Sequence, residues 1–491
     1  MHPTPPSFFE RLNAWLRQSV TIKLLSLAIL MLLLLIPASM VENLIAERAQ
    51  TRDQATAEVS AKWGGPQQLT GPVLVLPYRR LERDDKNRLL ETTAYACFLP
   101  DTLAVTGTLA PEKRRRGIYD VVVYRSQLQV SGSFNTASLA DWNLPAADIR
   151  WNEAFVAVGL SDMKGIRTGL SLRWNGAAYP FEPGVASPDA LPAASAPQFG
   201  TLADETRQLE RYASAAVSID VTPAGGAATE AMSARVPLPD AAALQARHRF
   251  SFALDLNGSS ALFFAPLGRE TRVHLSAPWP DPSFAGAFLP RARTVSAQGF
   301  TADWQVLHLN RSYPQRWRTA DYRPQIDGST FGTRLIVPVD EYQKNMRAAK
   351  YALLPITLTF LIFFFVEVLN RRRIHPFQYI LVGLALIIFY TLLLAFSEHM
   401  AFNVAYLLAG AAIIGLVTAY AASIFRRRQL TLVTAGVLVL VYGFVFVVLQ
   451  LQDYALLIGS LGLLGVLATV MLLSRRIDWY APPAPADDSA T

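Results

Sequence analysis

The sequence has little cysteine and little histidine, and this limits the chemistry that it can carry. Its single cysteine, Cys97, excludes an intramolecular disulfide, and we expect it to be a buried, inert thiol. One cysteine cannot supply a structural zinc site. The six histidines show no metal-ligand spacing, and they are His2, His248, His274, His308, His375 and His399. G-x-G-x-x-G, P-loop and G-x-S-x-G motifs are absent too. We therefore predict no metal, no cofactor and no nucleotide or serine-hydrolase chemistry.

Charge is also scarce, because only 17% of the 491 residues are Asp, Glu, Lys or Arg, where soluble proteins have about 25%. Six windows contain none of these four residues: 24–41, 351–366, 374–397, 399–425, 429–452 and 454–474. A membrane-spanning helix needs roughly 20 apolar residues. The sequence therefore predicts six transmembrane helices, at 24–41, 350–369, 377–396, 401–423, 430–450 and 454–474.

The basic residues lie on alternate sides of these predicted helices. Segments 1–23 and 475–491 and the loops around 371–373 and 426–428 hold 11 Lys or Arg and four acids, so 11 − 4 = +7 equals the net charge of the chain. An excess of Lys and Arg in short loops is typical of the cytoplasmic side. We therefore expect both termini to be cytoplasmic. The same distribution argues against nucleic-acid binding, which needs a concentrated basic surface.

The first apolar segment could be a cleaved signal peptide or a retained anchor. Its length of about 18 residues exceeds a signal-peptide core, and Pro37-Ala38-Ser39-Met40 lacks a clean small-x-small cleavage site, so we favour the anchor. Residues 41–62 keep helical spacing without Gly or Pro and predict a helical stalk that leaves the membrane.

The remaining segment of 42–349 changes to period-two alternation after residue 64. Examples are Phe250 to Leu256, Tyr119 to Val123, Leu128 to Phe134 and Phe300 to Val306. This pattern predicts a large all-β, sandwich-like periplasmic domain of antiparallel strands, inserted between the first and second membrane helices. We expect one strand to end at Asn257-Gly258, Pro278 to Pro282 to form turns, and 183–197 and 222–229 to be loops. The sequence leaves open whether this segment folds as one β domain or as two.

Three groups of polar residues are candidates for function. Ser397-Glu398-His399 has the residue types of a hydrolase triad, but consecutive helical residues point in different directions, so we expect a helix cap, with a polar site at Glu398 and His399 as the alternative. Glu367 is the one acid within a predicted span. We expect it to pair with Arg371 or to reach the interface, with proton or ion movement as the alternative.

The third group is the basic run Lys113-Arg114-Arg115-Arg116. Such a run is most often a solvated turn, and anionic lipid head groups are its alternative partner. His375-Pro376 we expect to start a helix, because proline suits the first helical turn.

Several strings of the sequence together resemble the CreD family of cell-envelope integrity inner-membrane proteins. They include 350–352, 358–360, Phe364, Glu367, 373–379, 381–383, 389–390, 397–399 and 476–480 around the predicted helices, and 71–72, 116–119, 279–280, 282–284, 288–290 and 299–300 in the β segment. The resemblance implies a six-span inner-membrane protein with a large periplasmic domain and a role in envelope stress, without a defined molecular activity.

These observations favour a non-enzymatic inner-membrane protein for cell-envelope integrity. We expect its periplasmic domain to bind an envelope lipid, glycan or protein partner, in addition to the contact of the helices with the lipid bilayer. The alternatives are a transporter or lipid-moving protein and an enzyme of the outer leaflet. The ligand and the oligomeric state are left open.

Overall fold

The computed structural model describes residues 20–83, 89–135, 142, 144–185, 230–318, 322–336, 341–369, 374–451 and 454–475. The chain divides into two compact units, which we describe separately. The helical unit comprises residues 1–52 and 339–491, and the β unit comprises residues 53–338. The predicted loops at 222–229 and most of 183–197, the Arg371–Arg373 loop, and the tail beyond Arg475 lie outside the described residues.

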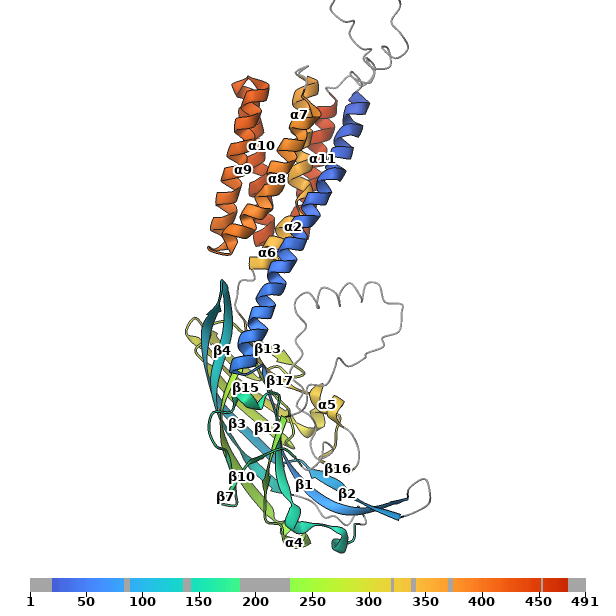
Figure 1. Ribbon diagram of the computed structural model, residues 1–491, viewed down its shortest axis with the longest axis vertical. Coiled ribbons are helices and arrows are strands. Elements are labelled where there is room, and N and C mark those ends of the chain that lie inside the picture. Colours follow the sequence, from blue (N-terminus) through green and yellow to red (C-terminus); the bar gives the residue numbers. More distant parts are fainter. Residues whose placement is uncertain are drawn as a thin grey trace, which may run out of the picture. The chain divides into compact units, whose positions relative to one another are not determined.

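The helical unit is built from long apolar helices that lie side by side (Figure 1). The helices are α2 (Val20–Trp63, whose end belongs to the β unit), α6 (Glu341–Lys350), α7 (Leu353–Leu369), α8 (Pro376–Ser397), α9 (Phe402–Phe425), α10 (Arg428–Gln450) and α11 (Ala455–Ser474). In the described part of the chain, five helical segments are long and apolar enough to cross a membrane: Lys23–Trp63, Glu341–Val368, Pro376–Ser397, Phe402–Phe425 and Arg428–Gln450. A shorter apolar stretch, Leu456–Leu472, lies within α11.

The helix predicted over 350–369 is present as α7, which begins three residues later, and a separate helix, α6, precedes it. Helix α6 ends at Lys350 and α7 begins at Leu353, so Tyr351 and Ala352 form a break. Pro355 explains the break, because a proline ring clashes with the carbonyl group four residues earlier, here that of Tyr351, if the helix is continuous. Residues 41–62 are helical, as predicted, since α2 continues without interruption to Trp63.

The β unit contains two sheets. The first consists of β1 (Gln67–Arg83), β2 (Leu89–Phe98), β5 (Phe155–Leu160), β8 (Glu182–Pro183), β9 (Glu230–Arg235), β11 (Ala261–Phe264), β13 (Pro282–Gly286), β16 (Arg316–Arg318) and β17 (Phe331–Leu335). The second consists of β3 (Thr102–Arg116), β4 (Tyr119–Asn135), β6 (Ser171–Trp174), β7 (Ala177–Pro180), β10 (Arg247–Ser259), β12 (Glu270–Ala277), β14 (Ala292–Ser296) and β15 (Gly299–Leu307), in the order β14-β15-β12-β3-β4-β10-β6-β7. A short helix, α4 (Ala241–Gln245), precedes β10, and α5 (Arg323–Asp327) precedes β17.

The strands predicted from alternation are present, but the pairing is mixed. Two of the pairs are parallel, β1 with β11 and β3 with β12, whereas the sequence predicts antiparallel strands throughout. Each parallel pair joins a strand from residues 67–116 to one from residues 261–277. Parallel neighbours require a long crossover connection, and alternation within one strand carries no information about such a distant partner.

One hydrophobic core serves both sheets. Val73 of the first sheet and Val130 of the second are fully buried members of the same cluster, so the β unit is a single β-sheet-rich domain and not two. Cys97 lies in this core with 1% of its surface exposed, which confirms the expectation of a buried thiol.

Strand β10 passes through the predicted stop at Asn257-Gly258 and ends at Ser259. A Cβ atom on Gly258 would come within 2.4 Å of the Tyr124 ring, so this glycine serves close packing and not a turn. The chain turns instead at Ser260, which has a φ of 60°. The prediction failed because glycine in a strand can mark close packing as well as an end.

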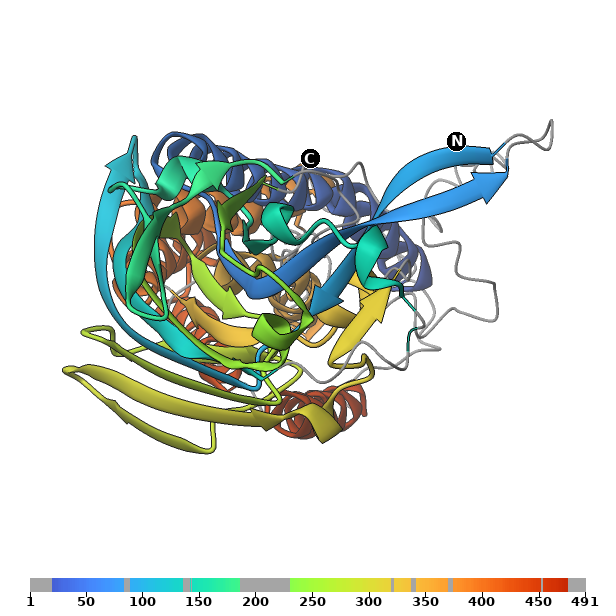
Figure 2. The ribbon, with the colours of Figure 1, turned by 90° about the horizontal axis from the view of Figure 1, so that it is seen from below.

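The β1–β2 hairpin extends beyond the rest of its sheet (Figure 2). Its outer part exposes Leu81, Leu89 and Leu90, each with half or more of its surface open to solvent. The turn residues at 84–88 lie outside the described part of the chain.

Candidate functional site

The basic run 113–116 is not a solvated turn. Its four residues are the last four of strand β3, and they pair with Tyr119 to Val122 of β4. Gly117 and Ile118 connect the two strands, and Gly117 has the positive φ of 62° that favours glycine. The prediction failed because four consecutive charges show no alternation of apolar and polar residues, which is the signal of a strand. The segment is extended because it pairs with Val121 and Val122 of the neighbouring strand.

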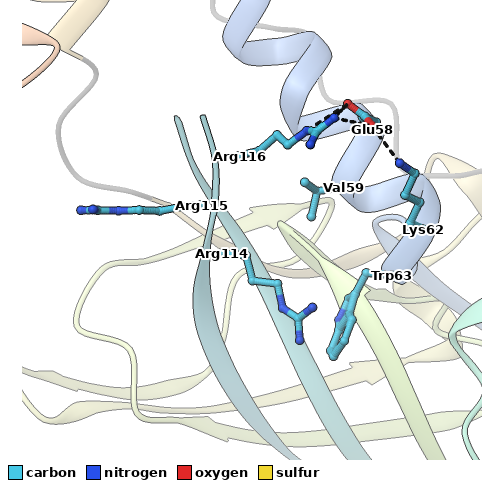
Figure 3. Close-up of a pocket in the computed structure, with 7 residues that line it drawn as sticks. All are labelled: Glu58, Val59, Lys62, Trp63, Arg114, Arg115 and Arg116. Atoms are coloured by element: carbon cyan, nitrogen blue, oxygen red, sulfur yellow. Dashed lines mark hydrogen bonds and ion pairs between the residues drawn. The ribbon is translucent and has the colours of Figure 1, made fainter. Parts of the chain in front are cut away.

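Strand alternation divides the run between two faces, as Figure 3 shows. Arg116 points toward the end of α2, where its Nη2 donates to both carboxylate oxygens of Glu58 at 3.0 and 3.2 Å. Arg114 points the same way, and its guanidinium carbon lies 3.7 Å from the centre of the Trp63 ring. Arg115 points to the opposite side, where it contacts Asp120 at 3.2 Å.

The spacing of the strand matches that of the helix. Two strand residues, 114 and 116, are about 6.8 Å apart along β3. The five-residue interval from Glu58 to Trp63 rises by about 7.5 Å along α2. Both contacts can therefore form at once. Lys62 follows Glu58 by one helical turn and donates to the same carboxylate at 2.8 Å.

Trp63 is held from several sides. Its indole Nε1 donates to the carbonyl oxygen of Tyr124 at 3.3 Å, and the guanidinium of Arg125 lies 5.7 Å from its ring centre. An arginine over a tryptophan face is attracted by the electron-rich ring, by about 0.5–1 kcal/mol at an exposed site. The Trp63 ring thus holds the planar guanidinium group of Arg114 at the wall of the site.

Residues 58–63 and 114–116 line a shallow pocket with a volume of about 290 Å³. We call it the basic pocket; its lining residues are Glu58, Val59, Lys62, Trp63, Arg114, Arg115 and Arg116. Counting Lys113, Arg125 and the paired acids Glu112 and Asp120, its surroundings hold six cations and three carboxylates, so 6 − 3 = +3. Such an excess attracts anions.

An apolar side chain lies beside these charges. Ile118, at the tip of the hairpin, has 44% of its surface exposed. Guanidinium groups beside an exposed apolar side chain suit a membrane surface, where charged lipid head groups and apolar lipid chains lie close together.

Glu367 is buried in the helical unit and has two partners. Lys23 of α2 lies 2.8 Å from its Oε1, and the Tyr379 hydroxyl of α8 donates to its Oε2 at 3.0 Å. The sequence missed both. The expected partner, Arg371, lies outside the described residues. The partners of Glu367 come from two other helices, and the sequence does not show which helices will be its neighbours.

Ser397, Glu398 and His399 diverge at the end of α8. The Ser397 hydroxyl donates to the carbonyl oxygen of Leu394 at 2.9 Å and accepts from the Asn345 amide at 2.6 Å. Glu398 accepts from the Tyr342 hydroxyl at 3.3 Å and lies 3.9 Å from Arg48. The side chain of His399 is exposed. Within the described structure no hydrogen bond links the three side chains, so they lack the geometry of a hydrolase triad.

Four of the described histidines lie at defined positions in a helix cap, a strand or a turn. His375 caps α8, accepting a hydrogen bond from the Phe377 backbone at 3.2 Å, and Pro376 opens the helix, as predicted. His248 and His274 lie on strands, and His308 begins a 3₁₀ turn. Among the residues described, no group of three or more His, Cys, Asp or Glu side chains could hold a metal ion.

Apolar helices of spanning length, together with a folded β-sheet unit carrying a basic pocket, define a membrane protein with a large β-sheet-rich domain. A family model described as "Inner membrane protein CreD" matches residues 19–480. The "Inner membrane protein CreD" of Escherichia coli (strain K12) is 32% identical over 469 residues, which cover 94% of each chain. The chain belongs to the CreD family, and it is a multi-pass inner-membrane protein.

Proposed function

We propose that this chain is a non-enzymatic protein of cell-envelope integrity and stress response whose β unit lies in the periplasm and binds anionic lipid head groups at the basic pocket. The observation that carries the proposal is the excess of three positive charges around the Arg114–Trp63 contact, beside the exposed apolar tip at Ile118. A lipid phosphate suits this pocket, since arginine and lysine donors bind phosphate oxygens strongly.

The proposal includes six spans with both termini in the cytoplasm. Helix α11 has 20 residues, which at 1.5 Å per residue cover about 30 Å, the thickness of the hydrocarbon layer. Arg426, Arg427 and Arg428 at the start of α10 and Arg475 after α11 support the orientation, because short basic loops stay on the cytoplasmic side.

A scaffolding role for the helices is supported by the pairing of their buried charge. Glu367 is satisfied by Lys23 and Tyr379, and the exposed His399 makes no hydrogen bond to Ser397 or Glu398 among the described residues. These arrangements favour a structural use of both groups over ion movement or outer-leaflet catalysis.

The test of head-group binding uses the purified full chain in a neutral detergent. Short-chain phosphatidylglycerol and phosphatidylcholine are titrated by calorimetry. We expect saturable binding of the anionic lipid only. The double variant Arg114→Ala/Arg116→Ala should weaken this binding about tenfold or more, because each lost charge-assisted contact costs about 1.5–3 kcal/mol.

Arg272→Ala is the matched control. Arg272 is an exposed, ion-paired arginine on the same sheet but outside the basic pocket, so its loss should leave the affinity unchanged. Equal affinity for the two lipids, or equal losses in the double variant and the control, would refute the proposal.

A separate labelling experiment tests on which side of the membrane the β unit lies. In a Cys97→Ala background, Arg115→Cys places a thiol where the native side chain is 83% exposed. A membrane-impermeant maleimide should label it in intact spheroplasts. Labelling only after the membrane is disrupted would place the β unit in the cytoplasm and contradict the proposed topology.

A further inference from the structure

A second depression lies on the outward face of the second sheet, away from the hairpin of the basic pocket. Its floor is made of small residues that adjacent strands place side by side. Thr102 of β3 pairs with Ser133 of β4, and Ser131 pairs with both Ala104 and Ser251. Because large side chains are missing here, the surface is hollowed to a volume of about 530 Å³, within the range of small-molecule sites.

Three arginines surround this floor. Arg247 and Arg249 are two residues apart on β10 and therefore share its outward face, and Arg173 of β6 is paired directly with Ser251. All three are exposed. We call the depression the arginine groove, with its arginines at 173, 247 and 249 and its hydroxyl groups at 102, 131, 133 and 251.

Among the described residues, no acid neutralises the arginines of the groove. Arg247 donates to the neutral Ser133 hydroxyl at 3.3 Å and has no carboxylate partner in the described part of the chain. Within the described part of the chain, neither Arg173 nor Arg249 has a carboxylate within 4.0 Å. The nearest acid in sequence to the floor, Asp101, is paired with Arg269 at 3.1 Å. This contrasts with the basic pocket, where Arg114, Arg115 and Arg116 each have a carboxylate partner.

Unpaired arginines repel one another, and the planar guanidinium group binds phosphate or carboxylate oxygens in pairs. An anion placed among them relieves the repulsion and gains these bonds. The Thr102 and Ser133 hydroxyl groups are hydrogen-bonded to each other at 2.9 Å, and Ser133 is buried. The partly exposed hydroxyl groups of Ser131 and Ser251 offer neutral donors and acceptors, which complement the hydroxyl groups of a sugar.

We propose that the arginine groove binds an acidic saccharide, a sugar unit that carries a phosphate or a carboxylate group. The arginines hold the acidic group and the hydroxyl floor holds the sugar ring. This site is separate from the basic pocket, and the proposal stands or fails independently of lipid binding there.

The experiment titrates the purified full chain, in neutral detergent, with N-acetylglucosamine phosphate, N-acetylmuramic acid, N-acetylglucosamine and inorganic phosphate. We expect one or both acidic sugars to bind at least tenfold more tightly than the neutral sugar and inorganic phosphate. Preference for the first acidic sugar identifies phosphorylated saccharides as the ligand class, and preference for the second identifies carboxylated ones. Either result supports the site. Equal binding of the neutral sugar, or of inorganic phosphate alone, overturns it.

Variants locate the binding. Arg173→Ala/Arg249→Ala should lower the affinity at least tenfold, and Arg173→Lys/Arg249→Lys, which keeps the charge but not the paired donors, should lower it less. Arg272→Ala should have no effect. The folded state of each variant is checked by circular dichroism, and the lysine pair tests the site if the alanine pair fails to fold. Unchanged affinity in both pairs, or a loss confined to Arg114→Ala/Arg116→Ala, overturns the proposal.

Discussion

Lys23 and Glu367 form an ion pair of 2.8 Å between α2 and α7, although 344 residues separate them in the sequence. The Glu367 side chain is 6% exposed and the Lys23 side chain 32%. The chain therefore keeps one buried carboxylate in an otherwise apolar helix and neutralises it with a cation from the first helix of the bundle.

Removing one member of this pair should destabilise the helical unit. In Glu367→Gln, Lys23 is left without its counter-ion, and we expect a loss of about 2 kcal/mol, less than for a fully buried pair because Lys23 reaches solvent. Unfolding of the full chain by titration with a denaturing detergent measures it. The double variant Lys23→Met/Glu367→Gln should lose less than the two single variants added together, and strict additivity would show that the pair has no coupling energy.

Two tyrosines in the same unit offer a matched comparison. The Tyr406 hydroxyl donates to the carbonyl oxygen of Tyr442 at 2.9 Å, whereas the buried Tyr390 hydroxyl has no hydrogen-bond partner among the described residues. Tyr406→Phe should therefore cost about 1 kcal/mol, and Tyr390→Phe should be neutral or stabilising. Thermal unfolding of the two variants side by side checks this. A larger loss in Tyr390→Phe than in Tyr406→Phe would indicate a partner for its hydroxyl group.

Gly132 marks a position in β4 where no side chain fits. An added Cβ would lie 2.0 Å from the Thr102 carbonyl oxygen and 2.7 Å from the Phe250 ring. Gly132→Ala should destabilise the β unit by about 1–3 kcal/mol, because a backbone contact cannot yield. Ser131→Ala, one residue away on the outward face, should change stability by less than about 0.5 kcal/mol. Similar losses in both variants would contradict the packing argument.

Glu270 should make the β unit sensitive to acid. Hydrogen bonds from Gln305 and then from Arg272 lower the pKa of its carboxyl group. The folded state therefore gains stability above the unfolded pKa of about 4.3 and loses it as the pH falls through the lower, folded pKa. Relative to the native chain, Glu270→Gln should be less stable by about 0.5 kcal/mol at neutral pH. The difference should vanish in acid. Unfolding measured from pH 7 downward tests this, and a difference that persists unchanged in acid would argue against the linkage.

Local patterns in the sequence predicted local structure well. Alternation located β4, β10 and β15, and the uncharged windows located the apolar helices. An error arose where one residue type serves two purposes: Gly258 packs against Tyr124 without ending its strand. The helix expected from residue 350 begins at Leu353, just before Pro355.

The partners within the sites could not be predicted. Glu58 and Arg116 lie 58 residues apart, and only the folded hairpin brings them together. The run at 113–116 is recognisable in the sequence as a charge cluster, whereas Arg173, Arg247 and Arg249 are not, because two separate strands supply them. Alternation places a residue on a face of its strand, but it does not give the order of strands in the sheet.

Because the rise of α2 matches the two-residue repeat of β3, the basic pocket depends on the number of residues in β3 as much as on the types of residue that line it. Inserting or deleting one residue in β3 before Arg114 would turn Arg115 toward Glu58 and Trp63 and send its two neighbours to the opposite face. A two-residue change would restore the facing pattern while moving it along the helix by about 6.8 Å, or roughly one and a quarter helical turns. In β3, therefore, the parity of the residue count determines which arginines face α2.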